Sequence, residues 1–381
     1  MKFGTKAIHA GVKPDPTTGA IMTPIYQTST YVQSAPGKNK GYAYARAQNP
    51  TRDALQESLA SLENGKYGIC FSSGLAAMDA ILRILKSGDE VIATNDIYGG
   101  SYRLLTKVLA QFGIKSHFID MSEPSNILNY ITPNTKYIMV ETPTNPMLNI
   151  VDIKAVVKIS QQHKIKVVVD NTFASPYLQN PLDLGADIVW HSCTKYLGGH
   201  SDVVMGAVIT KRKSIADKIY FIQNAAGAIP GPQDCFLMLR GIKTLHLRVQ
   251  RSCENAKKVA AFLKAHKKVS KVYWPGFKDN ASYKVARNQM RNFGGMVSFD
   301  LKQNKMSTAK KVMSGTKLFA LAESLGGVES LIGHPASMTH ASIPKADRMK
   351  IGLTDSLIRL SVGVEDADDL VEDLGKALDR I

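Results

Sequence analysis

Two kinds of apolar pattern alternate along the first two thirds of the chain. Short apolar runs typical of strands buried on both faces of a sheet are separated by longer stretches whose apolar residues recur about once per helical turn. The predicted strands cover 68–71, 90–93, 115–119, 136–141, 166–170 and 188–190, and helices are predicted from Asp53, from Leu75, over 101–112 and over 153–163. This alternation predicts an α/β fold, with a large, mostly parallel sheet covered by helices on both faces.

Polar and glycine-rich turns follow several of these strands. They occupy 72–74, 98–100, 141–146 and 170–172. In open α/β sheets, ligands bind outside the carboxyl ends of the strands. A helix that begins there directs free backbone N–H groups at an anion. We therefore expect a ligand site at this edge of the sheet.

The pattern changes character near residue 245. A helical stretch leads into predicted strands at 271–274 and 295–301, and the chain ends in a helix predicted from Asp366 with acidic residues in its first turn. This mixture predicts a smaller C-terminal α+β domain. We expect three parts: an irregular N-terminal arm over 1–50, a ligand-binding α/β domain over 51–245, and the C-terminal domain over 246–381.

Composition narrows the class of protein. The 381 residues are 44% hydrophobic and 21% charged, which is ordinary for a globular chain. The formal net charge is +16, but the lysines are spread along the sequence, so we expect no nucleic-acid partner. No apolar run has the length of a membrane span or the form of a signal peptide. The four cysteines are widely spaced, which favours a cytoplasmic location.

Lys195 is the main candidate for chemistry. It stands in a polar turn after the strand at 188–190, beside the hydroxyls of Ser192 and Thr194 and before two glycines. Small hydroxyl residues and glycines let the backbone approach a phosphate. A lysine among them can form a Schiff base with an aldehyde cofactor. By itself, this motif is also compatible with a surface lysine in a loop.

The full set of motifs resembles the pyridoxal-phosphate enzymes of cysteine and methionine metabolism, which include cystathionine γ-lyase and cystathionine γ-synthase. The resemblance covers nearly the whole chain and implies the PLP-dependent transferase fold, fold type I, with pyridoxal 5'-phosphate as cofactor. The motifs that carry it lie at 44–46, 49–52, 73–77, 98–103, 141–146, 170–173, around Lys195, at 321–327 and at 358–363.

The resemblance assigns catalytic roles to three residues. Lys195 looks like the lysine that bonds to the cofactor and later moves protons. Asp170 looks like the partner of the ring nitrogen, where a carboxylate keeps that nitrogen protonated. Tyr98 looks like the ring that stacks on the cofactor and exchanges protons with the substrate.

Further residues resemble the cofactor and substrate ligands of the family. The residues that resemble the phosphate cradle are Gly74, Leu75, Ser192 and Thr194. Tyr44 and Arg46 resemble phosphate ligands donated by a neighbouring subunit, with Arg46 also reaching the substrate. Arg359 resembles the clamp on the substrate α-carboxylate, with Asn145 and Ser324 beside it. Arg103 and Glu323 resemble residues that reach the distal end of the substrate. A shared active site implies at least a dimer, and the family usually forms tetramers.

Other chemistry is less well supported. His191 and His200 have no partner at metal-ligand spacing, so we expect no metal. Cys193 replaces a small residue and is interpreted as packing. A noncatalytic protein that keeps the fold is a third hypothesis, but it predicts the loss of Lys195, Asp170 or Arg359, all of which are present.

Within the family, the residues favour γ-elimination on cystathionine, giving cysteine, 2-oxobutyrate and ammonia. Gly100 and Glu323 disfavour a methionine γ-lyase, and Ser324 disfavours a cystathionine β-lyase, which tends to have an aromatic residue there. Cystathionine γ-synthase, which replaces the acyloxy group of an O-acylhomoserine by cysteine, remains the alternative. It shares the remaining site residues.

Overall fold

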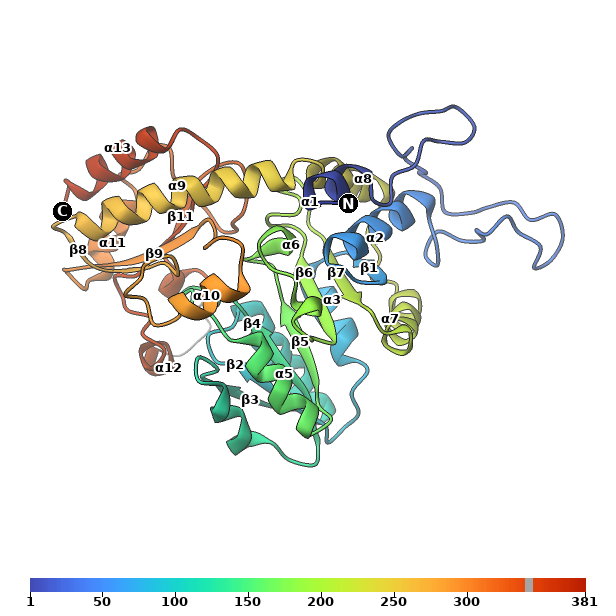
Figure 1. Cartoon of the computed structure of the whole chain (residues 1–381), viewed down its shortest axis with the longest axis horizontal. Coiled ribbons are helices and arrows are strands. Elements are labelled where there is room, and N and C mark those ends of the chain that lie inside the picture. Colours follow the sequence, from blue (N-terminus) through green and yellow to red (C-terminus); the bar gives the residue numbers. More distant parts are fainter. Residues whose placement is uncertain (340–344) are drawn as a thin grey trace.

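A seven-stranded sheet forms the centre of the larger part of the protein, seen in a computed structural model that describes residues 1–339 and 345–381 (Figure 1). Its strand order is β1-β7-β6-β5-β4-β2-β3. The strands are β1 (Tyr67–Phe71), β2 (Glu90–Thr94), β3 (Lys115–Ile119), β4 (Thr135–Glu141), β5 (Lys166–Asp170), β6 (Ile188–Ser192) and β7 (Gly206–Thr210).

The sheet is mostly parallel, as the alternation predicts. Strands β2 to β6 run parallel to one another, whereas β7 lies between β1 and β6 and is antiparallel to both. Sequence reasoning missed β7, because its short apolar run follows directly on the polar stretch around Lys195. Because β4, β5 and β6 are parallel neighbours, their carboxyl ends lie side by side, at Glu141, Asp170 and Ser192.

Helices cover both faces of this sheet, as expected. Alternate residues of β5 face opposite cores: Val168 packs with α3 and α7, and Val167 and Val169 pack with α5. The helices of this part are α1 (Phe3–His9), α2 (Pro50–Leu62), α3 (Gly74–Leu82), α4 (Gly99–Arg103), α5 (Ile153–Gln162), α6 (Ser175–Leu178), α7 (Lys213–Ala226) and α8 (Pro232–Ile242).

The helix predicted over 101–112 is helical but not uniform. It is built from α4, a π-helical turn at Leu104–Val108 and a 3₁₀ segment at Leu109–Phe112 that ends at Gly113, whose φ is +78°. Apolar periodicity detects a helical stretch but does not distinguish its hydrogen-bond type. Further 3₁₀ segments lie at Pro124–Tyr130, Pro181–Asp183 and Pro335–Ser337.

A five-stranded sheet forms the second, smaller core, with strand order β10-β11-β12-β9-β8. Its strands are β8 (Val269–Tyr273), β9 (Met296–Leu301), β10 (Ala320–Leu321), β11 (Leu331–Gly333) and β12 (Ile358–Ser361). The long helix α9 joins the two parts and packs against this sheet with α13 (Figure 1). The helices here are α9 (Leu245–Ala265), α10 (Tyr283–Gln289), α11 (Met306–Met313), α12 (Lys345–Lys350) and α13 (Ala367–Leu378).

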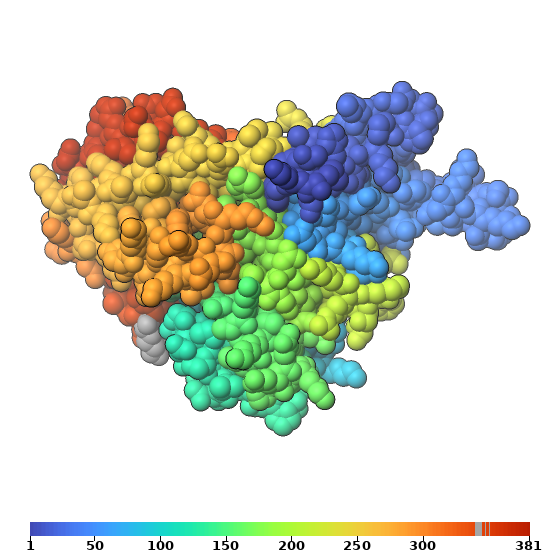
Figure 2. Space-filling model, in the orientation of Figure 1, coloured from blue at the N-terminus to red at the C-terminus, as the bar shows by residue number. Residues whose placement is uncertain are grey.

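Between α1 and α2 the chain forms long loops that extend away from the body (Figures 1 and 2). The arm ends where Asn49 caps α2, its side chain accepting hydrogen bonds from the N–H groups of Thr51 and Arg52. Arg52 is 2% exposed, and its guanidinium donates to the carbonyls of residues 45, 46 and 47. The base of the arm is therefore fixed to the body.

Candidate active site

A cavity of about 410 Å³ lies at the carboxyl ends of β4, β5 and β6. Residues from the C-terminal part, among them Glu323 and Arg359, close its other side. The predicted site residues that line it are Gly74, Leu75, Tyr98, Asn145, Asp170, Ser192, Thr194, Lys195, Glu323, Ser324 and Arg359. The fold thus brings most of the predicted set into one space.

Lys195 lies in the turn after β6, with its amine inside the cavity. Its Nζ donates a hydrogen bond to the hydroxyl of Ser324 at 2.8 Å. Burial lowers the pKa of Lys195 to about 8, helped by the positive charge of Arg359 and opposed by Glu323. About one tenth of this amine is therefore neutral at pH 7, far more than for an ordinary lysine. The neutral amine is the form that attacks an aldehyde or accepts a proton.

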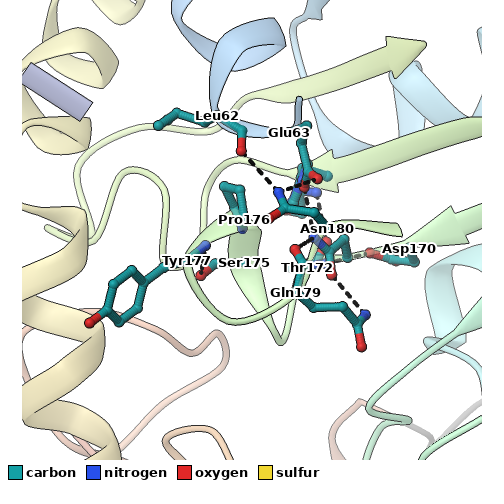
Figure 3. Close-up of polar contacts among 12 residues, drawn as sticks. Leu62, Glu63, Asp170, Thr172, Ser175, Pro176, Tyr177, Gln179 and Asn180 are labelled. Atoms are coloured by element: carbon teal, nitrogen blue, oxygen red, sulfur yellow. Dashed lines mark hydrogen bonds and ion pairs between the residues drawn. The ribbon is translucent and has the colours of Figure 1, made fainter. Parts of the chain in front are cut away.

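Asp170 ends β5 at the floor of the cavity, where Thr172 holds its carboxylate. The Thr172 N–H donates to Asp170 Oδ1 at 2.9 Å, a contact drawn in Figure 3. The Thr172 hydroxyl accepts from the Ser192 N–H at 2.9 Å, so its own proton is free for the carboxylate. Burial raises the pKa of Asp170, against these hydrogen bonds and the charge of His191. A buried carboxylate with fixed orientation suits a cationic ring nitrogen.

The amino end of α3 meets the end of β6 at very close range. Ser73 caps the helix by accepting from the Ala76 N–H at 3.0 Å, while the first N–H groups of the helix have no acceptor within it. A Cβ on Gly74 would come within 2.8 Å of the Ser192 Cβ, so only glycine allows this approach. Free N–H groups, the Ser192 and Thr194 side chains and the positive end of the helix together suit a phosphate.

Tyr98 lies at the edge of the cavity and is 40% exposed. Its backbone N–H donates to the carboxyl of Glu141 at 2.9 Å, and its ring lies over Gly100, where a Cβ would meet the ring at 2.4 Å. Burial raises the pKa of Glu141 well above its usual range, with the charge of Asp170 adding to the effect. The sequence reasoning assigned no role to Glu141, although it ends a strand beside Asp170.

Arg359 reaches the cavity from β12 of the smaller sheet. It is 5% exposed, and its two terminal nitrogens donate to Asn145 Oδ1 at 2.9 Å and to the Ser324 carbonyl at 3.0 Å. Burial lowers its pKa to about 10. Ser324 has a φ of +103°, a strained value for a residue with a side chain, and it contacts both Arg359 and Lys195. Ser324 thus connects the two predicted residues Arg359 and Lys195.

Three predicted residues do not line the cavity. Tyr44 is exposed on the arm, and Arg46 donates through Nε to Asn224 at the end of α7 at 3.3 Å. Arg103 lies at the end of α4, near Gly99. Within one chain, these residues are therefore separate from Lys195, and their assigned roles stay predictions.

The histidines and the cysteine near Lys195 have structural surroundings. His191 is buried and lies 2.6 Å from Glu63, and His200 Nδ1 lies 2.8 Å from the Gly198 carbonyl. Cys193 is fully buried in an apolar core, which raises the pKa of its thiol. Over residues 1–339 and 345–381, no group of three or more histidine, cysteine or acidic side chains has the arrangement of a metal site.

The arrangement fits pyridoxal phosphate on its own chemistry. The close approach of Gly74 to Ser192 makes an anion cradle, the Lys195 amine can bond to an aldehyde, and Asp170 offers a buried carboxylate.

In the described part of the chain, no helix combines the length and apolarity that crossing a membrane requires.

Comparison with known proteins agrees with this fit. The family model for Cys/Met metabolism PLP-dependent enzymes matches residues 4–379. A cystathionine γ-lyase of Bacillus subtilis is 50% identical, with 100% of both chains covered. A cystathionine β-lyase of Coxiella burnetii is 51% identical, covering 98% of this chain and 97% of its own. A cystathionine γ-synthase of Mycobacterium leprae is 50% identical, covering 99% and 96%.

The fold of the chain is also that of solved enzymes with these names. The crystal structure of cystathionine γ-lyase from Lactobacillus plantarum complexed with L-serine superposes with a TM-score of 0.97 at 47% identity, over 100% of this chain and 99% of that one. The relatives named for β-elimination are as similar as the others, so overall similarity does not favour one activity. The chain belongs to the family of Cys/Met metabolism PLP-dependent enzymes and is a carbon–sulfur lyase whose cofactor is pyridoxal 5'-phosphate.

Proposed function

We propose that the chain is a cystathionine γ-lyase, which cleaves cystathionine with water to cysteine, 2-oxobutyrate and ammonia. The observation that carries the proposal is the set of groups around one cavity: a partly neutral lysine, a tyrosine, a buried arginine and a glutamate. Each corresponds to one requirement of γ-elimination from a substrate with two amino-acid ends.

Pyridoxal phosphate, when bound, supplies an electron sink for charge that develops at the substrate Cα. Asp170 would hold its ring nitrogen, and the α3 amino end with Ser192 and Thr194 would hold its phosphate. Lys195 would carry it and then, once released, remove the Cα proton and move a proton at Cβ. For this work the amine must be neutral, which its lowered pKa favours.

The other cavity residues would bind and orient the substrate. Arg359, held by Asn145 and Ser324, offers its guanidinium to the α-carboxylate. Glu323 suits the distal ammonium group of cystathionine. The Tyr98 hydroxyl is the candidate acid that protonates the departing sulfur, so that cysteine leaves as a neutral thiol.

We further propose a shared active site in a homotetramer built from dimers. The exposed arm supports this, since Tyr44 and Arg46 lie outside the cavity of their own chain and Val32 is 93% exposed. We also propose a cytoplasmic location, which the four free cysteines support.

Two further activities stay open, because relatives bearing those names are equally similar. A γ-synthase would use the same groups to join cysteine to an O-acylhomoserine. A β-lyase would cleave cystathionine to homocysteine, pyruvate and ammonia. The expectation that Ser324 disfavours the β-lyase rests on this one position alone.

Product analysis on one enzyme stock distinguishes the three. We expect 2-oxobutyrate and cysteine from cystathionine, and little cystathionine from O-acylhomoserine with cysteine. Pyruvate and homocysteine in place of the first products would make the chain a β-lyase. Efficient synthesis of cystathionine with slow breakdown would make it a γ-synthase.

A further inference from the structure

A buried polar cluster lies behind the carboxyl ends of β5 and β6. Its centre is the pair Glu63 and His191, both 1% exposed, with His191 Nε2 at 2.6 Å from Glu63 Oε1. Side chains alternate along a strand, and Trp190 and Ser192 both line the cavity, so His191 between them points to the opposite face. The pair therefore does not contact a ligand in the cavity directly.

Glu63 is held by several donors at the end of α2. Besides His191, Asn171 Nδ2 donates to its Oε1 at 2.7 Å and Asn180 Nδ2 donates to its Oε2 at 3.3 Å. Figure 3 shows Glu63 and Asn180 next to the segment that carries Asp170 and Thr172. Buried charged groups are costly, and apolar residues often replace them without loss of stability. Packing alone therefore does not account for this cluster.

Two connections lead from the pair to Asp170. The first is through the backbone, because Asn171, bound to Glu63, directly follows Asp170, and its N–H donates to the Trp190 carbonyl at 3.1 Å. The second is electrostatic: burial raises the pKa of Asp170, while the hydrogen bonds from Thr172 and, to a smaller extent, the nearby His191 lower it.

The other ionisable groups around Asp170 do not replace this effect. Glu141 on the neighbouring strand β4 is a second carboxyl, and the charge of Asp170 adds to the effect of burial in raising its pKa. Lys195 lines the cavity on the opposite side of the sheet from His191, and its amine would be bonded to the cofactor. Among these groups, His191 is thus the basic side chain that lies behind Asp170, on the face of the sheet away from the cavity.

We propose that Glu63 and His191 form a positioning pair, which fixes the end of β5 through Asn171 and so keeps the Asp170 carboxylate aimed at the ring nitrogen of the cofactor. The inference rests on the role proposed above for Asp170. The pair would act through Asp170, without touching the substrate. It would affect how tightly the cofactor binds and how strongly the cofactor ring withdraws electrons.

The test compares H191Q and E63Q with H117Q in the full-length enzyme. Gln at 191 can still donate to Glu63, and Gln at 63 can still accept from His191, so both variants keep the hydrogen bond and remove an ionisable group. H117Q is the matched control, because His117 lies 3.1 Å from Glu90, at the amino-terminal end of the same sheet. The readouts are the dissociation constant of pyridoxal phosphate, the pH at which the visible absorption band of the loaded enzyme changes, and the thermal unfolding of the apoprotein.

We expect H191Q and E63Q to bind the cofactor about tenfold more weakly, the scale on which residues behind a ligand act. The pH midpoint of the visible band should rise in both, since a less protonated ring withdraws fewer electrons, and H117Q should match the wild type. Variants that lose thermal stability but keep the wild-type affinity and midpoint would reduce the pair to a structural role and overturn the inference. A wild-type protein that forms no visible band would instead overturn the proposed site.

Discussion

At the scale of single residues, Lys195 and Arg359 owe their chemistry to burial. Both side chains lie in one cavity, where burial lowers the pKa of each and the charge of Arg359 lowers that of Lys195 further. Arg359 keeps its charge through contacts with Asn145 and Ser324, whereas the Lys195 amine loses a proton more readily. In the proposed site, Arg359 would therefore be the fixed cation for a carboxylate and Lys195 the reactive amine.

This difference predicts how fast the apoprotein captures its cofactor at different pH values. Only the neutral amine reacts, and the pKa of Lys195 is lowered to about 8 from an ordinary 10.5. The capture rate should therefore rise about tenfold per pH unit below that value and level off above it. Stopped-flow absorbance of the apoprotein mixed with pyridoxal phosphate measures the rate. A rate that keeps rising toward the ordinary lysine pKa would show that the amine is solvated.

Sequence reasoning could propose roles for those residues that stand in a local motif. Lys195, Asp170 and Gly74 stand in short stretches in which turn, strand end and helix start are readable from neighbouring residues. Glu141 and the pair Glu63 and His191 gave no such signal, because their partners are distant in sequence: His191 and Glu63 are 128 positions apart. Only the fold brings them together.

At the scale of elements, the junction of α3 with β6 decides whether an anion can bind. Glycine at position 74 lets the helix start touch the end of the strand, and Gly206 on β7 allows an equally close contact with the Ser73 carbonyl. The first turn of α3 therefore presents its N–H groups next to the Ser192 hydroxyl. In the proposed site, α3 and β6 would form the phosphate cradle together.

The substitution G74A tests this junction. Its Cβ would lie 2.8 Å from the Ser192 Cβ and 2.9 Å from the Ser192 Cα, neither of which can move freely. Overpacking costs about 1–3 kcal/mol, so the affinity for pyridoxal phosphate should fall about fivefold or more. The affinity is measured by equilibrium titration of the apoprotein.

The control for this experiment is G375A within α13, where a Cβ meets only Phe262 at an ordinary 3.5 Å. That variant should keep the wild-type affinity and gain up to about 1 kcal/mol of stability, because alanine favours a helix interior. If G74A bound the cofactor as tightly as G375A, the cradle would not depend on the close approach of α3.

The helices and strands could be predicted from the sequence to different degrees. Buried strands such as β4 and β5 were predicted within a residue of their ends, because continuous apolar runs have few other interpretations. The strand β7 and the π-helical turn in the predicted helix 101–112 were missed. Both depend on contacts that no local pattern encodes: a position between two strands, and a change in hydrogen-bond spacing.

At the scale of the whole molecule, the exposed N-terminal arm has no evident role within a single chain. Its base is pinned by Arg52, whereas Tyr44 is 46% exposed and neither Tyr44 nor Arg46 lines the cavity of its own chain. An arm that is fixed at its base and presents an arginine and a tyrosine suits an anion on a neighbouring copy. The proposed shared site follows from this geometry.

A mixing experiment tests the sharing. K195A and R46A are each expected to be nearly inactive as pure proteins. In a hybrid of the two, one cavity combines Lys195 of one chain with Arg46 of the other. Random mixing should therefore restore about one quarter of the wild-type activity per chain, because half of the dimers are hybrids with one intact site of two. If mixing restored no activity, each cavity would have to use the arm of its own chain.

The most direct test of the account is to find where the cofactor is attached. The enzyme loaded with pyridoxal phosphate is reduced with borohydride, digested and analysed by mass spectrometry. We predict one modified peptide, with the pyridoxyl group on Lys195, and a K195A protein that carries no such label. A label on another lysine, or an unlabelled wild-type protein, would contradict the assignment of this cavity as the cofactor site.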